Sequence, residues 1–72
     1  MTLIDGTYDV IVVDAVDRGD DVIAIDVAVA SGVMRGDVVT VIARNLGMSE
    51  FDLLASPATL IIEDGQPRLT FD

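Results

Sequence analysis

Apolar and polar residues alternate with a period of two along most of this chain, which is the spacing of β-strands rather than of helices. The alternation predicts five strands, at residues 8–16, 21–30, 38–44, 58–63 and 68–72. Residues 48–55 instead have apolar positions at helical spacing. We therefore expect one short helix between the third and fourth strands.

The first predicted strand is apolar on both faces. One face carries Tyr8, Val10, Val12, Asp14 and Val16, and the other carries Ile11, Val13 and Ala15. Such a strand is either buried on both faces or curled, so that each of its ends serves a different sheet. The second strand has one face of large residues, made of Ile23, Ile25, Val27 and Val29. The third strand is again apolar on both faces.

Turn residues separate the predicted strands. Residues 17–20 are expected to turn the chain, with Gly19 supplying the positive φ that tight turns need. Asp64-Gly65 is the strongest hairpin signal in the sequence. A longer connection is expected at residues 31–37.

The predicted helix has a recognisable start and stop. Ser49 is expected to cap its free amides, with Asp52 in a capping-box position and Met48 and Leu53 in hydrophobic-staple positions. Pro57 ends it, because the residue before a proline avoids helical geometry. Three residues at helical spacing are expected to plug the core: Phe51, Leu54 and Ala55. Truncation of Leu54 to alanine should then cost about 2–5 kcal/mol.

The order of elements predicts a mostly β fold in a single domain, residues 1–72. A long first strand, a helix after the third strand and a closing hairpin are typical of the five-stranded Greek-key barrel called the OB-fold. Closure of the sheet would remove exposed strand edges. An SH3-like barrel and a small β-sandwich completed by self-association are the alternative architectures.

The composition narrows the classes of partner. Thirteen acidic residues against four arginines give a net charge of −9, a field that repels nucleic-acid phosphate and attracts basic protein surfaces. No apolar run exceeds four residues, whereas about 20 are needed to span a bilayer. With no export signal and no cysteine, a cytoplasmic protein without membrane partners is expected.

Catalytic chemistry is poorly supplied. The chain has no histidine and no cysteine, so the usual proton shuttle and soft nucleophile are missing. Asp14 and Asp26 are the best carboxylate candidates, but a solvent-facing strand position, or an acid that accepts a backbone amide at a β-bulge, explains them better. The aspartates around residues 14–21 lack the order of a calcium loop. We expect no enzyme, no metal site and no cofactor.

A nucleic-acid surface on an OB barrel would use strands two and three with the first and last hairpin loops. Arg44 and Arg68 are expected to converge, because strands three and five are neighbours in this barrel. Arg35 and Tyr8 are the other candidate contacts.

Four segments carry a family resemblance: Gly6-Thr7-Tyr8, Asp52-Leu53-Leu54, Pro57-Ala58-Thr59-Leu60 and Asp64-Gly65-Gln66-Pro67. They resemble segments of small OB-fold proteins from phage and actinobacterial DNA replication modules. The resemblance implies an accessory protein whose partners are single-stranded DNA or replication and recombination enzymes. The residues that would carry such binding are Arg44, Arg68, Arg35 and Tyr8.

Two other functions fit the same residues. An acidic adaptor or DNA-mimic inhibitor would dock on a basic protein through Asp17, Asp20 and Asp21. A structural protein, such as a virion decoration subunit, would bury its apolar faces in a homo-oligomer.

Overall fold

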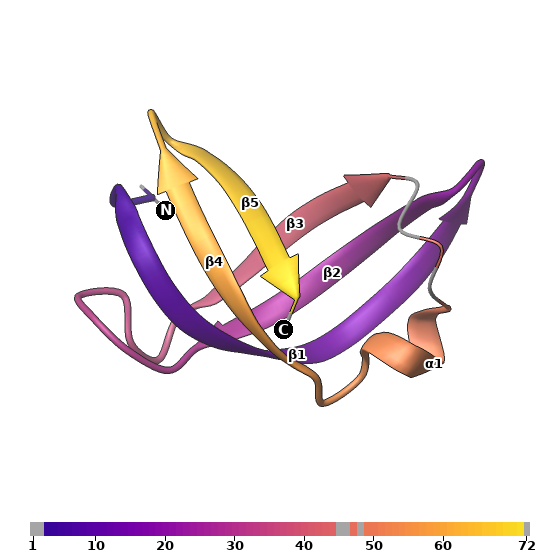
Figure 1. Cartoon of the computed structure of the whole chain (residues 1–72), viewed down its shortest axis with the longest axis horizontal. Helices are drawn as coiled ribbons and strands as arrows, with labels where there is room; N and C mark the ends of the chain where they lie inside the picture. The colour runs from indigo at the N-terminus through magenta and orange to yellow at the C-terminus, as the bar shows by residue number, and fades with distance from the viewer. Residues whose placement is uncertain (1–2, 45–46, 48, 72) are drawn as a thin grey trace.

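A computed structural model describes residues 3–44, 47 and 49–71, and it confirms the predicted fold class. The elements, in chain order, are β1 (Gly6–Gly19), β2 (Val22–Val29), β3 (Val38–Arg44), α1 (Glu50–Leu53), β4 (Pro57–Glu63) and β5 (Gln66–Phe71). The strands form one antiparallel sheet in the order β3-β2-β1-β4-β5. The protein is an OB-like, mostly β fold with one short helix between β3 and β4 (Figure 1).

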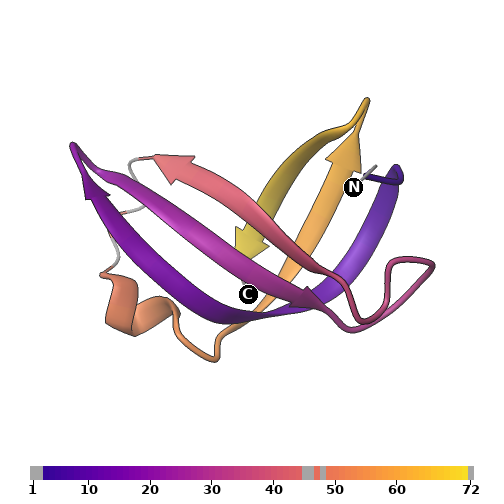
Figure 2. The same cartoon turned by 180° about the vertical axis from the view of Figure 1, so that it is seen from behind.

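The sheet curls into a half-barrel because β1 serves both of its halves. The first part of β1 pairs with β4, and the part from Val10 onward pairs with β2. The edge strands β3 and β5 approach each other across the open side of the curl without pairing (Figures 1 and 2). Of the two forms that the sequence allows for its first strand, buried on both faces or curled, the structure has the curled one.

A β-bulge in β1 changes which side chains face the core. Val12 lies opposite Val27 and Asp14 opposite Asp26, so Val13 is an extra residue with no partner of its own. A bulge bends the strand and increases its twist. Beyond it, Ala15 is buried and Val16 is exposed, the reverse of the uninterrupted alternation predicted from the sequence.

The core lies in the concave side of the half-barrel. It contains the predicted face of β2 together with inward residues of β1, β3 and β4: Tyr8, Val10, Val12, Ala15, Ile23, Ile25, Val27, Val29, Val39, Val41, Ala58, Leu60 and Ile62. Leu69 and Phe71 of β5 are partly buried and pack against its margin. Met34, from the connection between β2 and β3, is also fully buried, a role that the sequence did not suggest.

The helix reaches the core through a different residue from the one predicted. Leu53 is 0% exposed, whereas Leu54 is 44% exposed and Phe51 is 77% exposed. The helix is only one turn long, and Leu54 has already left helical geometry at φ −58° and ψ 133°. One turn presents one inward position, and Leu53 occupies it. The expectation that Phe51, Leu54 and Ala55 plug the core is therefore wrong, because Ala55 is exposed as well.

The helix start follows the prediction. Ser49 Oγ accepts a hydrogen bond from the backbone amide of Asp52 at 3.2 Å, and the Asp52 carboxylate accepts one from the Ser49 amide at 3.4 Å. This is the predicted capping box. The staple residue Met48 lies outside the described residues.

Both hairpin turns have consecutive residues at positive φ. Asp64 and Gly65 lie at φ 52° and 75°, which confirms the predicted turn. In the first hairpin Gly19 lies at φ 84°, as predicted, and it is followed by Asp20 and Asp21 at φ 54° and 60°, so the turn extends slightly beyond the predicted residues. Aspartate tolerates this region better than most residues. Among the residues described, no helix has the length and apolar character that crossing a bilayer requires.

Candidate functional site

Tyr8 is a core residue and not a binding residue. Its side chain is 4% exposed, and its hydroxyl donates a hydrogen bond to the Ile4 carbonyl at 2.7 Å. A base cannot stack on a ring that is enclosed in this way. The prediction that Tyr8 contacts nucleic acid is therefore contradicted by its burial.

The candidate arginines do not converge. Arg44 ends β3 opposite Val22, beside the β1–β2 hairpin, because β3 pairs with β2 along its length. Arg68 lies opposite Ile61, near the β4–β5 hairpin. These two hairpins are at opposite upper corners of Figure 1. Arg35 is exposed in the connection between β2 and β3. The expectation that Arg44 and Arg68 converge is wrong, because Arg44 lies beside the β1–β2 hairpin and Arg68 beside the β4–β5 hairpin.

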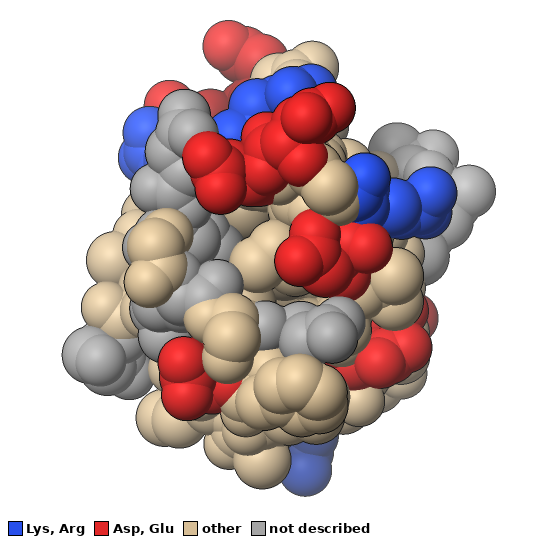
Figure 3. Space-filling model, turned by 90° about the vertical axis from the view of Figure 1, so that its right-hand side faces the viewer, with Lys and Arg blue, Asp and Glu red and all other residues tan. Residues whose placement is uncertain are grey.

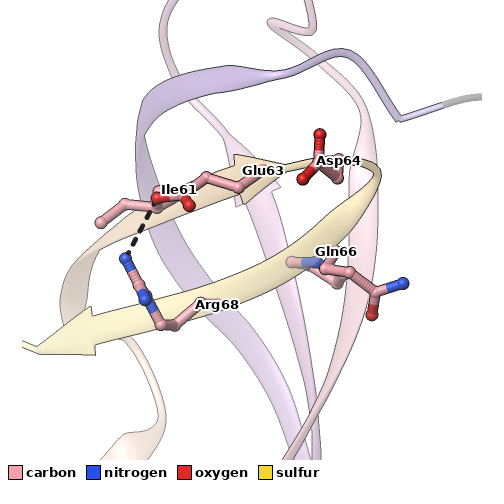
Figure 4. A pocket seen from close by; sticks show the side chains of 6 residues that line it. Ile61, Glu63, Asp64, Gln66 and Arg68 are labelled. Carbon is pink, nitrogen blue, oxygen red and sulfur yellow. Dashed lines mark hydrogen bonds and ion pairs between the residues drawn. The ribbon is translucent and has the colours of Figure 1, made fainter.

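Arg68 has a local partner instead. Its Nη2 lies 3.4 Å from Glu63 Oε1, and both side chains are largely exposed (Figure 4). They belong to a shallow pocket on the last hairpin that is also lined by Ile61, Asp64, Gln66 and Pro67. An exposed ion pair of this kind contributes little to stability, about 0–1 kcal/mol.

The predicted acidic loop forms the tip of the β1–β2 hairpin. Asp20 and Asp21 occupy the turn, and Asp17 Oδ1 accepts a hydrogen bond from the Gly19 amide at 2.8 Å. Figure 3 shows acidic side chains gathered at the upper end of this side of the molecule, with arginine beside them. Within the described ranges, no three acidic side chains lie close enough together to hold a metal ion.

The convex side of the sheet over β1, β2 and β3 is unusually apolar. Five branched side chains point outward there and are 47–53% exposed: Ile11, Val13, Val16, Val38 and Ile42. We call this surface the outer β1–β3 face. Two of its rows cross all three strands, Ile11–Ala28–Val38 and Val16–Ala24–Ile42. The small alanines of β2 thus lie between larger side chains of its neighbours.

Two aspartates occupy the row between these apolar rows. Asp14 and Asp26 are direct cross-strand partners, and Thr40 follows on β3. Thr40 Oγ1 donates a hydrogen bond to Asp26 Oδ1 at 2.6 Å. Asp14 Oδ1 accepts one from the adjacent Ala15 amide at 2.9 Å. The outer β1–β3 face is therefore an apolar surface with two carboxylates at its centre.

The other half of the same sheet is different. Its outward rows are Asp9–Thr59–Thr70 and Thr7–Ile61–Arg68. These are mostly the polar residues expected on a solvated sheet face. The contrast between the halves makes the outer β1–β3 face the most distinctive surface of the described residues.

The sequence signal for this surface is the two-sided apolar pattern of the first and third strands, which fits a strand buried on both faces as well as a curled one. Ile11 and Val13 belong to the second apolar face of the first strand. A sheet with a core on one side only leaves the second face exposed.

No protein-family model, curated protein or solved structure matches this chain.

Proposed function

We propose that this protein is a non-enzymatic binding module that docks on another protein through acidic and apolar surface. The observation that carries the proposal is the exposed outer β1–β3 face, which continues toward the acidic hairpin tip. Protein interfaces combine an apolar centre with a charged rim that steers the partner. A net charge of −9 favours a basic partner.

The placement of the carboxylates supports binding rather than catalysis. Asp14 is exposed and Asp26 is half-buried on the convex face of the sheet, and neither lines the shallow pockets beside the β4–β5 hairpin. The chain also has neither histidine nor cysteine to act with them.

Direct binding of single-stranded DNA has less support from the geometry. Single-strand binding combines stacking aromatics with a basic path for the phosphates. Tyr8 is buried, Arg44 and Arg68 are apart, and the first hairpin is acidic. DNA binding nevertheless stays a prediction that a simple titration decides. With labelled oligo-dT at about 20 mM salt, where screening is weak, we expect no change in anisotropy. Saturable binding that weakens with salt would contradict the protein-docking proposal.

A selection from a random peptide display library tests the proposal directly. The immobilised protein should enrich peptides that combine arginine or lysine with large apolar residues. Synthetic copies of the enriched peptides should lose affinity for the triple variant Asp17→Asn, Asp20→Asn and Asp21→Asn, because the acidic tip attracts them. Asparagine tolerates the positive φ of the turn, so this variant should fold.

A matched control separates the hairpin from net charge. The triple variant Asp9→Asn, Asp37→Asn and Asp64→Asn removes the same number of charges elsewhere, and we expect it to bind the peptides nearly as well as the unaltered protein. No enrichment, or enrichment of acidic peptides, would refute the proposed function. Equal losses of peptide affinity in the two triple variants would show that the acidic hairpin has no specific part in binding.

A further inference from the structure

We propose that the outer β1–β3 face is the docking surface, and that its occupant is a protein segment with large apolar side chains around a central arginine or lysine. The inference rests on the proposed function and assigns it a location and a partner chemistry. It differs from docking by the hairpin tip alone, which needs only charge.

The first argument is the exposure of two apolar rows on one sheet face. Val16 and Ile42 are the outer members of one three-strand row, and Ile11 and Val38 are those of another, with the Asp14–Asp26 row between them. All four are about half exposed. Exposed apolar side chains scattered singly need no explanation, but several of them gathered on one face mark an interaction site.

The second argument is the comparison within one sheet. On β4 and β5 the outward positions include Thr59, Thr70 and Arg68, so the same chain places polar residues where its sheet meets water. Threonine would satisfy the strand geometry at Val16 or Val38 equally well, because threonine is β-branched like valine. The outward rows of the other half are polar apart from Ile61, which is half-buried.

The third argument is charge, and it identifies the occupant. Asp14 lies directly opposite Asp26, and like charges in this arrangement destabilise a sheet. The arginines lie elsewhere: Arg18 and Arg44 near the β1–β2 hairpin, Arg35 in the connection after β2, and Arg68 on β5. Arg68 pairs with Glu63 beside the β4–β5 hairpin, on the other half of the sheet. A cation supplied by the partner would relieve this repulsion.

A second copy of this chain fits the face poorly. Each copy would bring its own Asp14 and Asp26 to the centre of the contact, and each carries a net charge of −9. Like charges placed together across an interface disfavour a partner. We therefore expect the protein to remain monomeric in sedimentation equilibrium at all concentrations tested. A dimer that Ile42→Thr dissociates would overturn the proposal.

The probe for this face is a short synthetic peptide of leucines around one central arginine. Titrated into ¹⁵N-labelled protein, it should shift the amide signals of the outer β1–β3 face and leave those of Thr59 and Thr70 in place. The same peptide with glutamate for arginine should bind at least about tenfold more weakly. Absence of shifts on this face would overturn the inference.

Two matched pairs of variants make the test specific. Asp26→Asn keeps an oxygen for the Thr40 hydroxyl and should weaken peptide binding about tenfold, whereas Asp9→Asn, with the same net charge, should not change it. Ile42→Thr should weaken binding similarly, and Thr70→Val on the polar half should have no effect.

The outcomes separate this inference from the proposed function. Peptides that bind only at the acidic hairpin would preserve a protein-binding module and overturn the assignment of this face. Failure of the display selection to enrich any basic peptide would overturn the proposed function itself. Circular dichroism of each variant shows that its fold is retained.

Discussion

Leu53 connects the one-turn helix to the core, and its neighbour Leu54 does not. We expect Leu53→Ala to lower the free energy of unfolding by about 2–5 kcal/mol, since it leaves a cavity in a fully buried site. Leu54→Ala should cost less than about 1 kcal/mol, because that side chain is partly solvated. Urea denaturation of both variants measures the difference. Equal losses would show that the helix packs in another way.

Gly32 is the second residue whose identity the structure explains. It lies at φ 76°, and a Cβ there would come within 2.9 Å of the buried Tyr8 ring. Gly36, in the same connection, lies at φ 92° with open space around it.

These two glycines form a natural comparison. Gly36→Ala should cost only the strain of positive φ, about 1–2 kcal/mol. Gly32→Ala should cost at least about 1 kcal/mol more, because the Tyr8 ring must also move. Thermal unfolding followed by circular dichroism tests the order. A Gly36→Ala variant less stable than Gly32→Ala would contradict the placement of Tyr8.

At the scale of elements, the helix depends on its cap. A single turn makes few internal hydrogen bonds, so the capping box formed by Ser49 and Asp52 supplies much of its order. Ser49→Ala should cost about 1 kcal/mol. Ser49→Asp should recover most of this loss, because aspartate is an equally good cap. Amide exchange of residues 50–55 reports the effect locally, and unchanged exchange in Ser49→Ala would refute it.

The strands show what period-two patterns can and cannot predict. The inward face of β2 and the Asp64-Gly65 turn follow from local sequence alone, and both are confirmed. The bulge at Val13 does not follow from local sequence, because the alternation of apolar and polar residues does not show where a strand has one more residue than the strand it pairs with. It reversed the faces predicted for Ala15 and Val16.

The helix shows a similar limit. The cap residues Ser49 and Asp52 were predictable from their spacing. Which leucine is buried was not, because a one-turn helix has no averaged apolar stripe, and the chain leaves helical geometry at Leu54.

For the candidate site, residue types were predictable but positions were not. The acidic hairpin could be located because its aspartates are contiguous with a turn. The separation of Arg44 from Arg68 depends on the hairpin to which each strand end belongs, which only the assembled sheet reveals. The outer β1–β3 face could not be predicted for the same reason. A strand that is apolar on both faces has the same sequence pattern whether its second face is covered or exposed.

At the scale of the whole molecule, the net charge of −9 on a chain of 72 residues opposes compaction through self-repulsion. Raising NaCl from about 10 mM to about 500 mM shortens the range of this repulsion. We expect the unfolding midpoint to rise by about 4 °C or more, equivalent to about 1 kcal/mol. The variant with Asp17, Asp20 and Asp21 changed to asparagine should respond less. A midpoint that falls with salt would contradict this account.

The central claim, that a partner's cation meets the acidic centre of an apolar sheet face, is tested most directly by a charge swap. Isothermal titration compares the leucine peptide carrying arginine with the one carrying glutamate, against the unaltered protein, Asp26→Arg and Asp9→Arg. We predict that the unaltered protein and Asp9→Arg prefer the arginine peptide, and that Asp26→Arg prefers the glutamate peptide. The claim is contradicted if Asp26→Arg and Asp9→Arg change the preference equally, since net charge alone would then explain binding.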